Sequence, residues 1–186
     1  MCKNKRRVAR HFDLRLITRI QIFTGSIYMT ENKTPIIIGC DHAAYALKEK
    51  VKAFILAEGY PVEDVGTHGE ASVDYPDFAA QVAGKVSAGK FKRGILICGT
   101  GIGMSMVANR FPYVRAALCN DLFSAIMSRR HNDSNILAMG GRVIGEALAL
   151  EVVKAWLETP FEGGRHQQRL NKFARPEDII GSCSGA

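Results

Sequence analysis

The chain is most constrained by a series of short apolar runs, each of strand length and each followed by a segment with helical periodicity. Five such runs occur, at 35–40, 61–65, 94–98, 114–119 and 135–140. Runs such as PIIIGC and GILIC are apolar throughout rather than at alternate positions, which is typical of parallel strands covered by helices on both faces. The pattern therefore predicts an α/β fold with a parallel sheet of about five strands.

Apolar side chains between the runs recur at spacings of three and four residues, which predicts helices. One stripe ends at Gly59, a second ends near Gly89 and a third ends before Pro160. The stripes consist of Leu47, Val51, Phe54 and Ile55; of Phe78, Val82 and Val86; and of Leu148, Val152, Ala155 and Trp156. Arg165 and Arg169 stand one helical turn apart near the end of the chain, so we expect a C-terminal helix there.

Parallel sheets bind ligands at the carboxyl ends of their strands, so the residues after each run are the first candidates for a site. The run at 94–98 ends in Cys98 and continues as a glycine-rich turn, with Gly99, Gly101 and Gly103 at alternate positions. Glycines let backbone amides approach a ligand at the positive end of the next helix, which predicts an anion-binding cradle. The spacing fits neither the dinucleotide fingerprint nor a P-loop.

Cys98 stands directly before this cradle, where a helix N-terminus favours the thiolate. A buried structural cysteine is the alternative interpretation. A thiolate beside anion-stabilising amides suits two reactions: acyl transfer through an oxyanion, or proton abstraction next to a carbonyl with an enediolate held in the cradle.

Polar residues follow the other strand ends as well. Asp41 and His42 follow the first run, and Asp41 could be only a helix cap. His131 stands at the end of a helical segment, where it could be only a residue favoured by the helix dipole. Arg142 follows the fifth run, and Arg165 with Arg169 could grip a phosphate or carboxylate in bidentate fashion. Together they predict a site for a small, doubly anionic ligand, with no metal-ligand set.

Charge and cysteine content exclude several classes of protein. The net charge is +7, but residues 1–28 carry seven Lys or Arg and one Asp, so the remaining residues carry only +1. A nearly neutral domain argues against a nucleic-acid-binding surface. The five cysteines have neither disulfide-framework nor zinc spacing, which favours a reducing, cytoplasmic compartment. No apolar run approaches the roughly 18 residues of a membrane span, so no membrane partner is expected.

The basic leader forms a separate region in this interpretation: residues 1–33 are an extension, 34–175 the domain and 176–186 a tail. Val8, Phe12, Leu16, Ile20 and Phe23 give the leader an amphipathic helical pattern. Three interpretations stay open: an organelle-type presequence, a membrane-surface or partner helix, or sequence upstream of a true start at Met29, outside the native chain.

Five motifs occur in order along the domain: GCDHAAYALK at 39–48, DYPDFA at 74–79, GILICGTGIGMSMVANR at 94–110, RRHNDSNILAMGGRVIG at 129–145 and FEGGRHQQR at 161–169. They closely resemble the B-type ribose-5-phosphate isomerase family, which includes allose- and galactose-6-phosphate isomerases. The resemblance covers Pro35 to Phe173. It implies a three-layer, Rossmann-like domain, a homodimer or dimer of dimers with a site shared between subunits, and sugar-phosphate isomerisation without metal or organic cofactor.

The resemblance also implies roles for individual residues. Cys98 is the implied base for proton transfer between C1 and C2, with Thr100 beside it, and Asp41 and His131 are implied in ring opening and hydroxyl handling. The implied substrate-binding residues are His42, Arg142, Arg165 and Arg169 around the phosphate, Asn132 and Tyr75 around the sugar, and Gly99, Gly101 and Gly103 around the enediolate.

Ribose 5-phosphate is the substrate we expect. Allose 6-phosphate, galactose 6-phosphate or a tetrulose phosphate are the alternatives, because pocket depth rather than motif residues determines the length of the sugar. Two other classes stay open: a cysteine hydrolase or acyltransferase with His42 or His131 as base, and a non-catalytic sugar-phosphate-binding protein.

Overall fold

A computed structural model describes residues 33–173 of the chain. The predicted amphipathic leader and the predicted tail lie outside these residues. Within them, five parallel strands form one sheet in the order β2-β1-β3-β5-β4. The strands are β1 (Ile36–Cys40), β2 (Val62–Asp64), β3 (Arg93–Cys98), β4 (Ala116–Leu118) and β5 (Ile136–Gly140). The predicted parallel sheet is confirmed.

The outer strands are shorter than their apolar runs. β2 has three residues where the sequence predicted 61–65, and β4 has three where it predicted 114–119. Both lie at the edges of the sheet, whereas β1, β3 and β5 lie inside it and are almost wholly buried. Edge strands pair on one side only and are commonly short.

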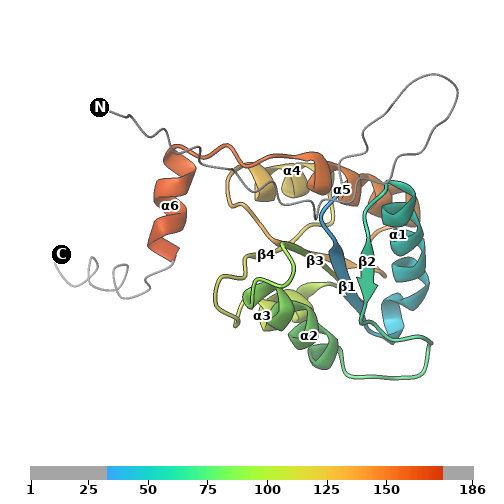
Figure 1. Ribbon diagram of the computed structural model, residues 1–186. Helices are drawn as coiled ribbons and strands as arrows, with labels where there is room; N and C mark the ends of the chain where they lie inside the picture. The colour runs from blue at the N-terminus through green and yellow to red at the C-terminus, as the bar shows by residue number, and fades with distance from the viewer. Residues whose placement is uncertain (1–32, 174–186) are drawn as a thin grey trace, which may run out of the picture. The chain divides into compact units, whose positions relative to one another are not determined.

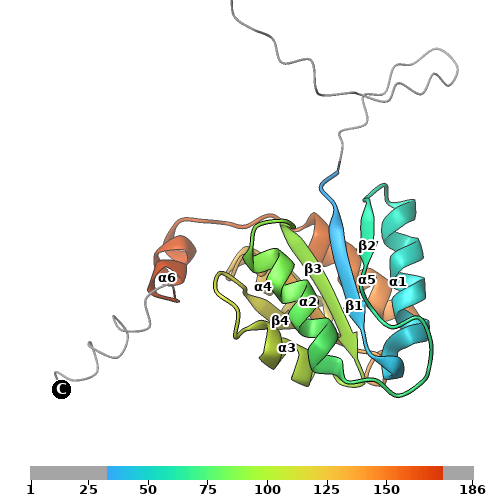
Figure 2. The same ribbon diagram turned by 60° about the horizontal axis from the view of Figure 1, so that its bottom comes forward.

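Helices cover both faces of the sheet, which confirms the predicted three-layer α/β fold (Figures 1 and 2). Residues of α1 (Tyr45–Ala57), α4 (Leu122–Arg130) and α5 (Glu146–Glu158) pack in the core of one face. Residues of α2 (Tyr75–Ser87) and α3 (Ile102–Ala108) pack in the core of the other. Strand residues alternate between the two cores, and Cys98 belongs to the α2–α3 side.

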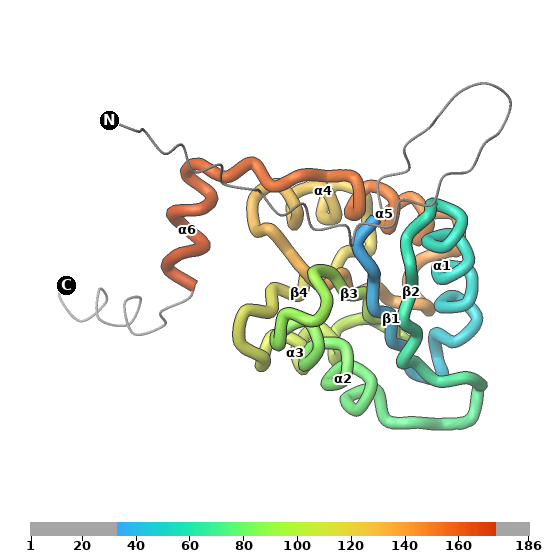
Figure 3. The backbone as a smooth tube through the Cα atoms, in the orientation of Figure 1, coloured from blue at the N-terminus to red at the C-terminus, as the bar shows by residue number. Residues whose placement is uncertain are grey.

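The C-terminal helix α6 (Arg165–Phe173) confirms that Arg165 and Arg169 share one helix. It stands apart from the three layers, as the backbone path shows (Figure 3). No helix within residues 33–173 is long and apolar enough to cross a membrane.

The strand order creates a switch point between β1 and β3. From β1 the chain moves to β2 on one side of it, and later to β3 on the other side. At such a point the loops after two neighbouring strands diverge and leave a crevice at their carboxyl ends. Cys40 and Cys98 are the last residues of these two strands. Asp41 and the glycine-rich turn therefore follow neighbouring strands at the same edge of the sheet.

Candidate active site

The glycine-rich turn wraps around the sulfur of Cys98. β3 ends at Cys98 and the turn leads into a helix, as the sequence predicted, and this helix, α3, begins at Ile102. The backbone N–H of Gly101 donates to Cys98 Sγ at 3.1 Å. The sulfur therefore faces the Gly101 amide of the turn. Cys98 is only 5% exposed in a single chain, so little of the residue is open to solvent there.

Gly101 and Gly103 are needed for steric reasons. Gly101 has a φ of 79°, and a Cβ there would lie 2.7 Å from the carbonyl carbon of Met139. A Cβ at Gly103 would lie 2.6 Å from the ring of Tyr75. The turn therefore packs directly against the end of β5 on one side and against Tyr75 on the other.

Asp41 follows β1 and is 7% exposed. It precedes the short 3-10 helix His42–Ala44, but its side chain makes no capping hydrogen bond, so the helix-cap interpretation is wrong. Within the described residues its Oδ1 atom is buried without a hydrogen-bond partner. A buried carboxylate oxygen without a partner is costly and is typical of a group that awaits a ligand.

The side chain of His42 is held by the loop before α2. Its Nδ1 atom lies 3.1 Å from the backbone N of Val73 and 3.2 Å from the carbonyl O of the same residue. Either tautomer of the ring can therefore bond to this backbone. The contact fixes the ring while leaving Nε2 as the second polar atom for a ligand.

Arg142 lies over the cradle from the end of β5. Its backbone N–H donates to the carbonyl O of Gly99 at 3.0 Å, and its Nη1 lies 3.9 Å from where a Cβ of Gly99 would stand. The structure thus gathers nine of the sequence-predicted site residues at the carboxyl ends of the strands: Asp41, His42, Tyr75, Cys98, Gly99, Thr100, Gly101, Gly103 and Arg142.

The other two cysteines in the described region differ from Cys98. Burial raises the pKa of Cys40 to about 12 and that of Cys119 to about 11, so both stay thiols at neutral pH. Neither carries the turn of amides that surrounds Cys98. Among these three residues, Cys98 is the candidate nucleophile or base.

A buried lysine that sequence reasoning missed supports the loop before α2. Lys48 is fully buried and donates to Asp64 Oδ2 at 2.8 Å and to the carbonyl O of Thr67 at 3.1 Å. Asp64 Oδ1 also accepts from Gly66 N at 3.0 Å. Burial would raise the pKa of Asp64, but the hydrogen bonds from Lys48 and Lys52 outweigh it and hold that pKa below its ordinary value.

The remaining predicted residues, His131, Asn132, Arg165 and Arg169, lie elsewhere. His131 follows α4, which runs back from the carboxyl end of β4. Arg115, directly before β4, donates through Nε to the carbonyl O of Asn132 at 3.0 Å. His131 and Asn132 therefore lie at the amino edge of the sheet, opposite Cys98. A single chain does not bring these four residues to the cradle.

A second histidine accompanies His131. The rings of His131 and His166 stack with centroids 4.2 Å apart and planes 5° from parallel. His166 is 4% exposed, and burial followed by the charges of His131, Arg165 and Arg169 lowers its pKa. A hollow of about 480 Å³ lies beside this pair. Sequence reasoning did not assign His166, although it stands between the two predicted arginines.

The same region holds a group of possible metal ligands. One ligand atom each from His131, Glu162 and His166 lies within 4.8 Å of the others. Arg165 Nε lies 3.5 Å from His166 Nε2 and donates to it. Because this guanidinium already occupies one of the three ligand atoms with a positive charge, the group fits a cation poorly.

Fold and site define a class: a three-layer α/β protein with a thiol and an anion-binding turn of amides at its switch point. Residues 36–173 match the family described as Ribose/Galactose Isomerase. The chain belongs to this family, which confirms the family predicted from the five motifs.

Individual relatives agree with this result. The chain is 49% identical to ribose-5-phosphate isomerase B of Escherichia coli over 142 residues, which are 76% of this chain and 95% of the relative. It is 43% identical to D-erythrulose-4-phosphate isomerase of Pectobacterium atrosepticum, over 74% and 91% of the two chains. The solved ribose-5-phosphate isomerase B of Clostridium thermocellum is 51% identical, with a TM-score of 0.76 over 78% and 99% of the chains.

Proposed function

We propose that this chain is an aldose-ketose isomerase that interconverts ribose 5-phosphate and ribulose 5-phosphate through an enediolate. The observation that carries the proposal is the Cys98 sulfur held 3.1 Å from the amide of Gly101, at the mouth of the cradle. Membership of the isomerase family supports the reaction. The ribose-5-phosphate isomerase B relatives support the substrate.

The cradle suits abstraction of a proton next to a carbonyl. Cys98, as thiolate, takes the proton from C2 and returns it to C1. Negative charge develops on O1 as C2 loses its proton, and the proton of the C2 hydroxyl passes to O1, so that the carbonyl group ends at C2. Preorganised amides facing that oxygen each lower such a barrier by about 3 to 4 kcal/mol in well-studied cases. We assign these amides to Gly99–Gly103, with the exposed hydroxyl of Thr100 beside them.

Ring opening needs a proton to move between the anomeric hydroxyl and the ring oxygen. We assign this step to Asp41 and His131. The unpartnered Oδ1 of Asp41 supports its part, because it can accept a hydrogen bond from a sugar hydroxyl. The imidazole of His131 offers a nitrogen that can donate or accept a proton in this step.

The phosphate binds away from the reacting carbons. We assign it to His42 and Arg142 beside the cradle, and to Arg165 and Arg169 on α6. Guanidinium groups match phosphate oxygens in bidentate fashion. Binding energy from this remote group holds C1 and C2 against Cys98. Asn132 and Tyr75 complete the assignment as residues that orient the sugar.

We further infer that two copies of the chain associate and share each site. Cys98 and His131 belong to opposite edges of the sheet, so His131, Asn132, Arg165 and Arg169 reach a cradle only if a second copy supplies them. Large apolar side chains next to the cradle support such contact. They are exposed by 37% to 72% in a single chain: Ile102, Met106, Leu118, Leu122 and Phe123.

One alternative substrate has specific support. The relative from Pectobacterium atrosepticum carries the name D-erythrulose-4-phosphate isomerase. A tetrulose phosphate would therefore be the second candidate. The hydrolase and the non-catalytic binding protein have no comparable support among these relatives.

A panel of phosphorylated aldoses and ketoses with four, five and six carbons tests the proposal. We expect the highest kcat/KM for ribose 5-phosphate, with solvent deuterium entering C1 or C2 and no covalent adduct on Cys98. A higher kcat/KM for a tetrulose phosphate would overturn the substrate assignment. A stable adduct of Cys98 without isomerisation would favour the hydrolase class.

We place this activity in the cytoplasm. Cys40, Cys98 and Cys119 are free thiols in the structure, which supports a reducing compartment. Fractionation of the source cells, with the activity expected in the cytosolic fraction, tests this point.

A further inference from the structure

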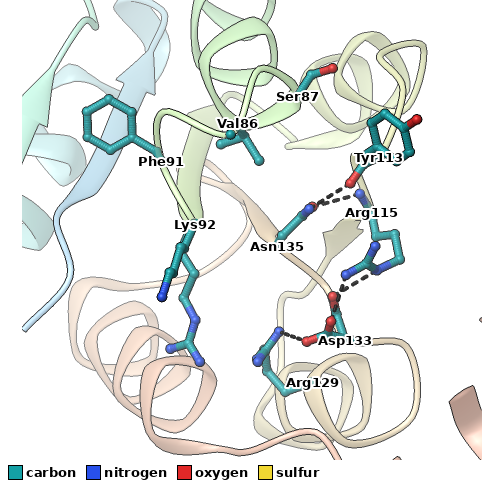
Figure 4. Close-up of a pocket in the computed structure, with 11 residues that line it drawn as sticks. Val86, Ser87, Phe91, Lys92, Tyr113, Arg115, Arg129, Asp133 and Asn135 are labelled. Carbon is teal, nitrogen blue, oxygen red and sulfur yellow. Dashed lines mark hydrogen bonds and ion pairs between the residues drawn. The ribbon is translucent and has the colours of Figure 1, made fainter. Parts of the chain in front are cut away.

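A second hollow lies at the amino edge of the sheet, away from the cradle. Its volume is about 450 Å³, within the range of small-molecule sites. Arg93 begins β3, Arg115 directly precedes β4 and Asn135 directly precedes β5, and all three line the hollow. Figure 4 shows lining side chains from these separate segments around one opening. None of the residues assigned to the isomerase site lines it.

The lining carries a strong excess of positive charge. The lining contains one carboxylate, that of Asp133, and four cationic side chains: Lys92, Arg93, Arg115 and Arg129. The excess is therefore three positive charges. The Asp133 carboxylate forms ion pairs with two of these cations, with Arg115 Nη2 at 2.7 Å and with Arg129 Nη1 at 2.8 Å.

Two of these cations lie close to each other, against the same buried aromatic ring. The guanidinium groups of Arg93 and Arg129 lie 5.5 and 5.8 Å from the centroid of the buried Trp156 ring. The side chain of Arg129 is 7% exposed. Burial and then the charge of Arg129 lower the pKa of Arg93. An anion in the hollow would relieve this repulsion.

Backbone strain is concentrated at the same place. Within residues 33–173, Tyr113 with a φ of 63° and Asp133 with a φ of 44° are the non-glycine residues of positive φ. Both line the hollow. Such conformations persist where the surroundings impose them, and they cluster at ligand sites.

We propose that this hollow binds the diphosphate group of a small molecule, a nucleoside diphosphate being the class that fits. Its roughly three negative charges match the excess of three positive charges on the lining. Each lining arginine already donates to a protein oxygen, as Arg93 Nη1 does to the carbonyl O of Leu157 at 2.6 Å, so phosphate oxygens would bind to the remaining guanidinium nitrogens. Tyr113, which is 80% exposed, supplies an aromatic face for a base on the rim (Figure 4).

Calorimetric titration of the full chain with ADP, without metal ions, tests the proposal. We expect saturable binding that weakens as salt is raised. Lys92 is exposed and lines the hollow, so Lys92→Glu changes its charge without disturbing the core. We expect this variant to weaken ADP binding about ten-fold or more, as loss of a charge-assisted contact does.

Two controls separate this site from others. Lys90→Glu makes the same charge change at an exposed residue that does not line the hollow, so its affinity should match the wild type. Replacing Arg165 and Arg169 by Ala weakens the proposed isomerase site and should leave ADP binding unchanged. Absence of ADP binding, equal loss in both lysine variants, loss in the double arginine variant, or equal binding of uncharged adenosine would each overturn the proposal.

Discussion

Gly101→Ala probes the cradle most sharply, because its effect on stability can be worked out from the structure. An alanine at a φ of 79° costs about 1 to 2 kcal/mol. Its Cβ would also lie 2.7 Å from the carbonyl carbon of Met139 and 2.8 Å from the oxygen, so the backbone has to move. Overpacking of this kind costs a further 1 to 3 kcal/mol or so. The free energy of unfolding should therefore fall by about 2 to 5 kcal/mol in total.

The same shift displaces the amide that faces Cys98, and loss of one aligned donor typically lowers kcat about 10²-fold or more. Gly59→Ala is the matched control, because Gly59 has a φ of 82° and nothing lies within 4 Å of the position that an alanine methyl group would take there. Gly59→Ala should lower the free energy of unfolding by only about 1 to 2 kcal/mol, which is the cost of an alanine at positive φ, and should leave kcat unchanged. Urea unfolding followed by fluorescence of the single tryptophan, at fixed protein concentration, and a ribulose 5-phosphate assay measure both effects. Equal stability and equal kcat in the two variants would refute the reasoning.

Three further expectations concern other parts of the chain. Asp64→Asn removes one of the two carboxylates that pair with the buried ammonium of Lys48, the other being Glu49 at 2.6 Å, and should lower the free energy of unfolding by about 1.5 to 3 kcal/mol. Because the pKa of Asp64 is lowered, the wild type's advantage in denaturant titrations should be full above pH 3.8 and vanish as pH falls through the folded-state pKa, and a difference independent of pH would count against it. Arg165→Ala and Arg169→Ala should each raise KM for ribose 5-phosphate and weaken competition by inorganic phosphate, whereas unchanged kinetics in both would remove them from the site. Because burial raises the pKa of Cys40 and of Cys119, iodoacetamide should modify Cys98 before these two cysteines in peptide mass spectra, and the reverse order would contradict its assignment as the reactive cysteine.

The central strands and the cradle were predictable because local chemistry determines them. β1, β3 and β5 are buried on both faces, so their sequences are apolar at nearly every position. The turn leaves no room for a Cβ at Gly101 or Gly103, and that requirement is visible in the sequence as glycines at these alternate positions. The edge strands were predicted too long, because pairing on one side ends before the apolar run does.

Two features depend on contacts between distant segments and could not be predicted. The strand order, with β5 between β3 and β4, follows from packing of whole helices. The burial of Lys48 follows from its contact with Asp64, 16 residues further along the chain. A signal for it did exist, since Lys48 stands three residues before Val51 and seven before Ile55, on the apolar side of α1.

The position of His131 at the edge opposite Cys98 could have been anticipated from helix direction alone. A helix that starts at the carboxyl edge of a parallel sheet ends near the amino edge, and His131 follows such a helix. His131 and Cys98 both belong to motifs of the same family, but they do not lie close together within one chain. A second copy that shares the site, as the family resemblance implies, is our proposed explanation for this separation.

The role of Cys98 as the base is tested most directly by the turnover of Cys98→Ala with ribose 5-phosphate in deuterated water, followed by NMR. We expect isomerisation and deuterium entry to fall about 10²- to 10⁴-fold, with ribose 5-phosphate binding and the oligomeric state retained; Cys98→Ser should also lose most activity. Near-normal turnover by the alanine variant would contradict the assignment of the sulfur as the group that takes hydrogen from carbon.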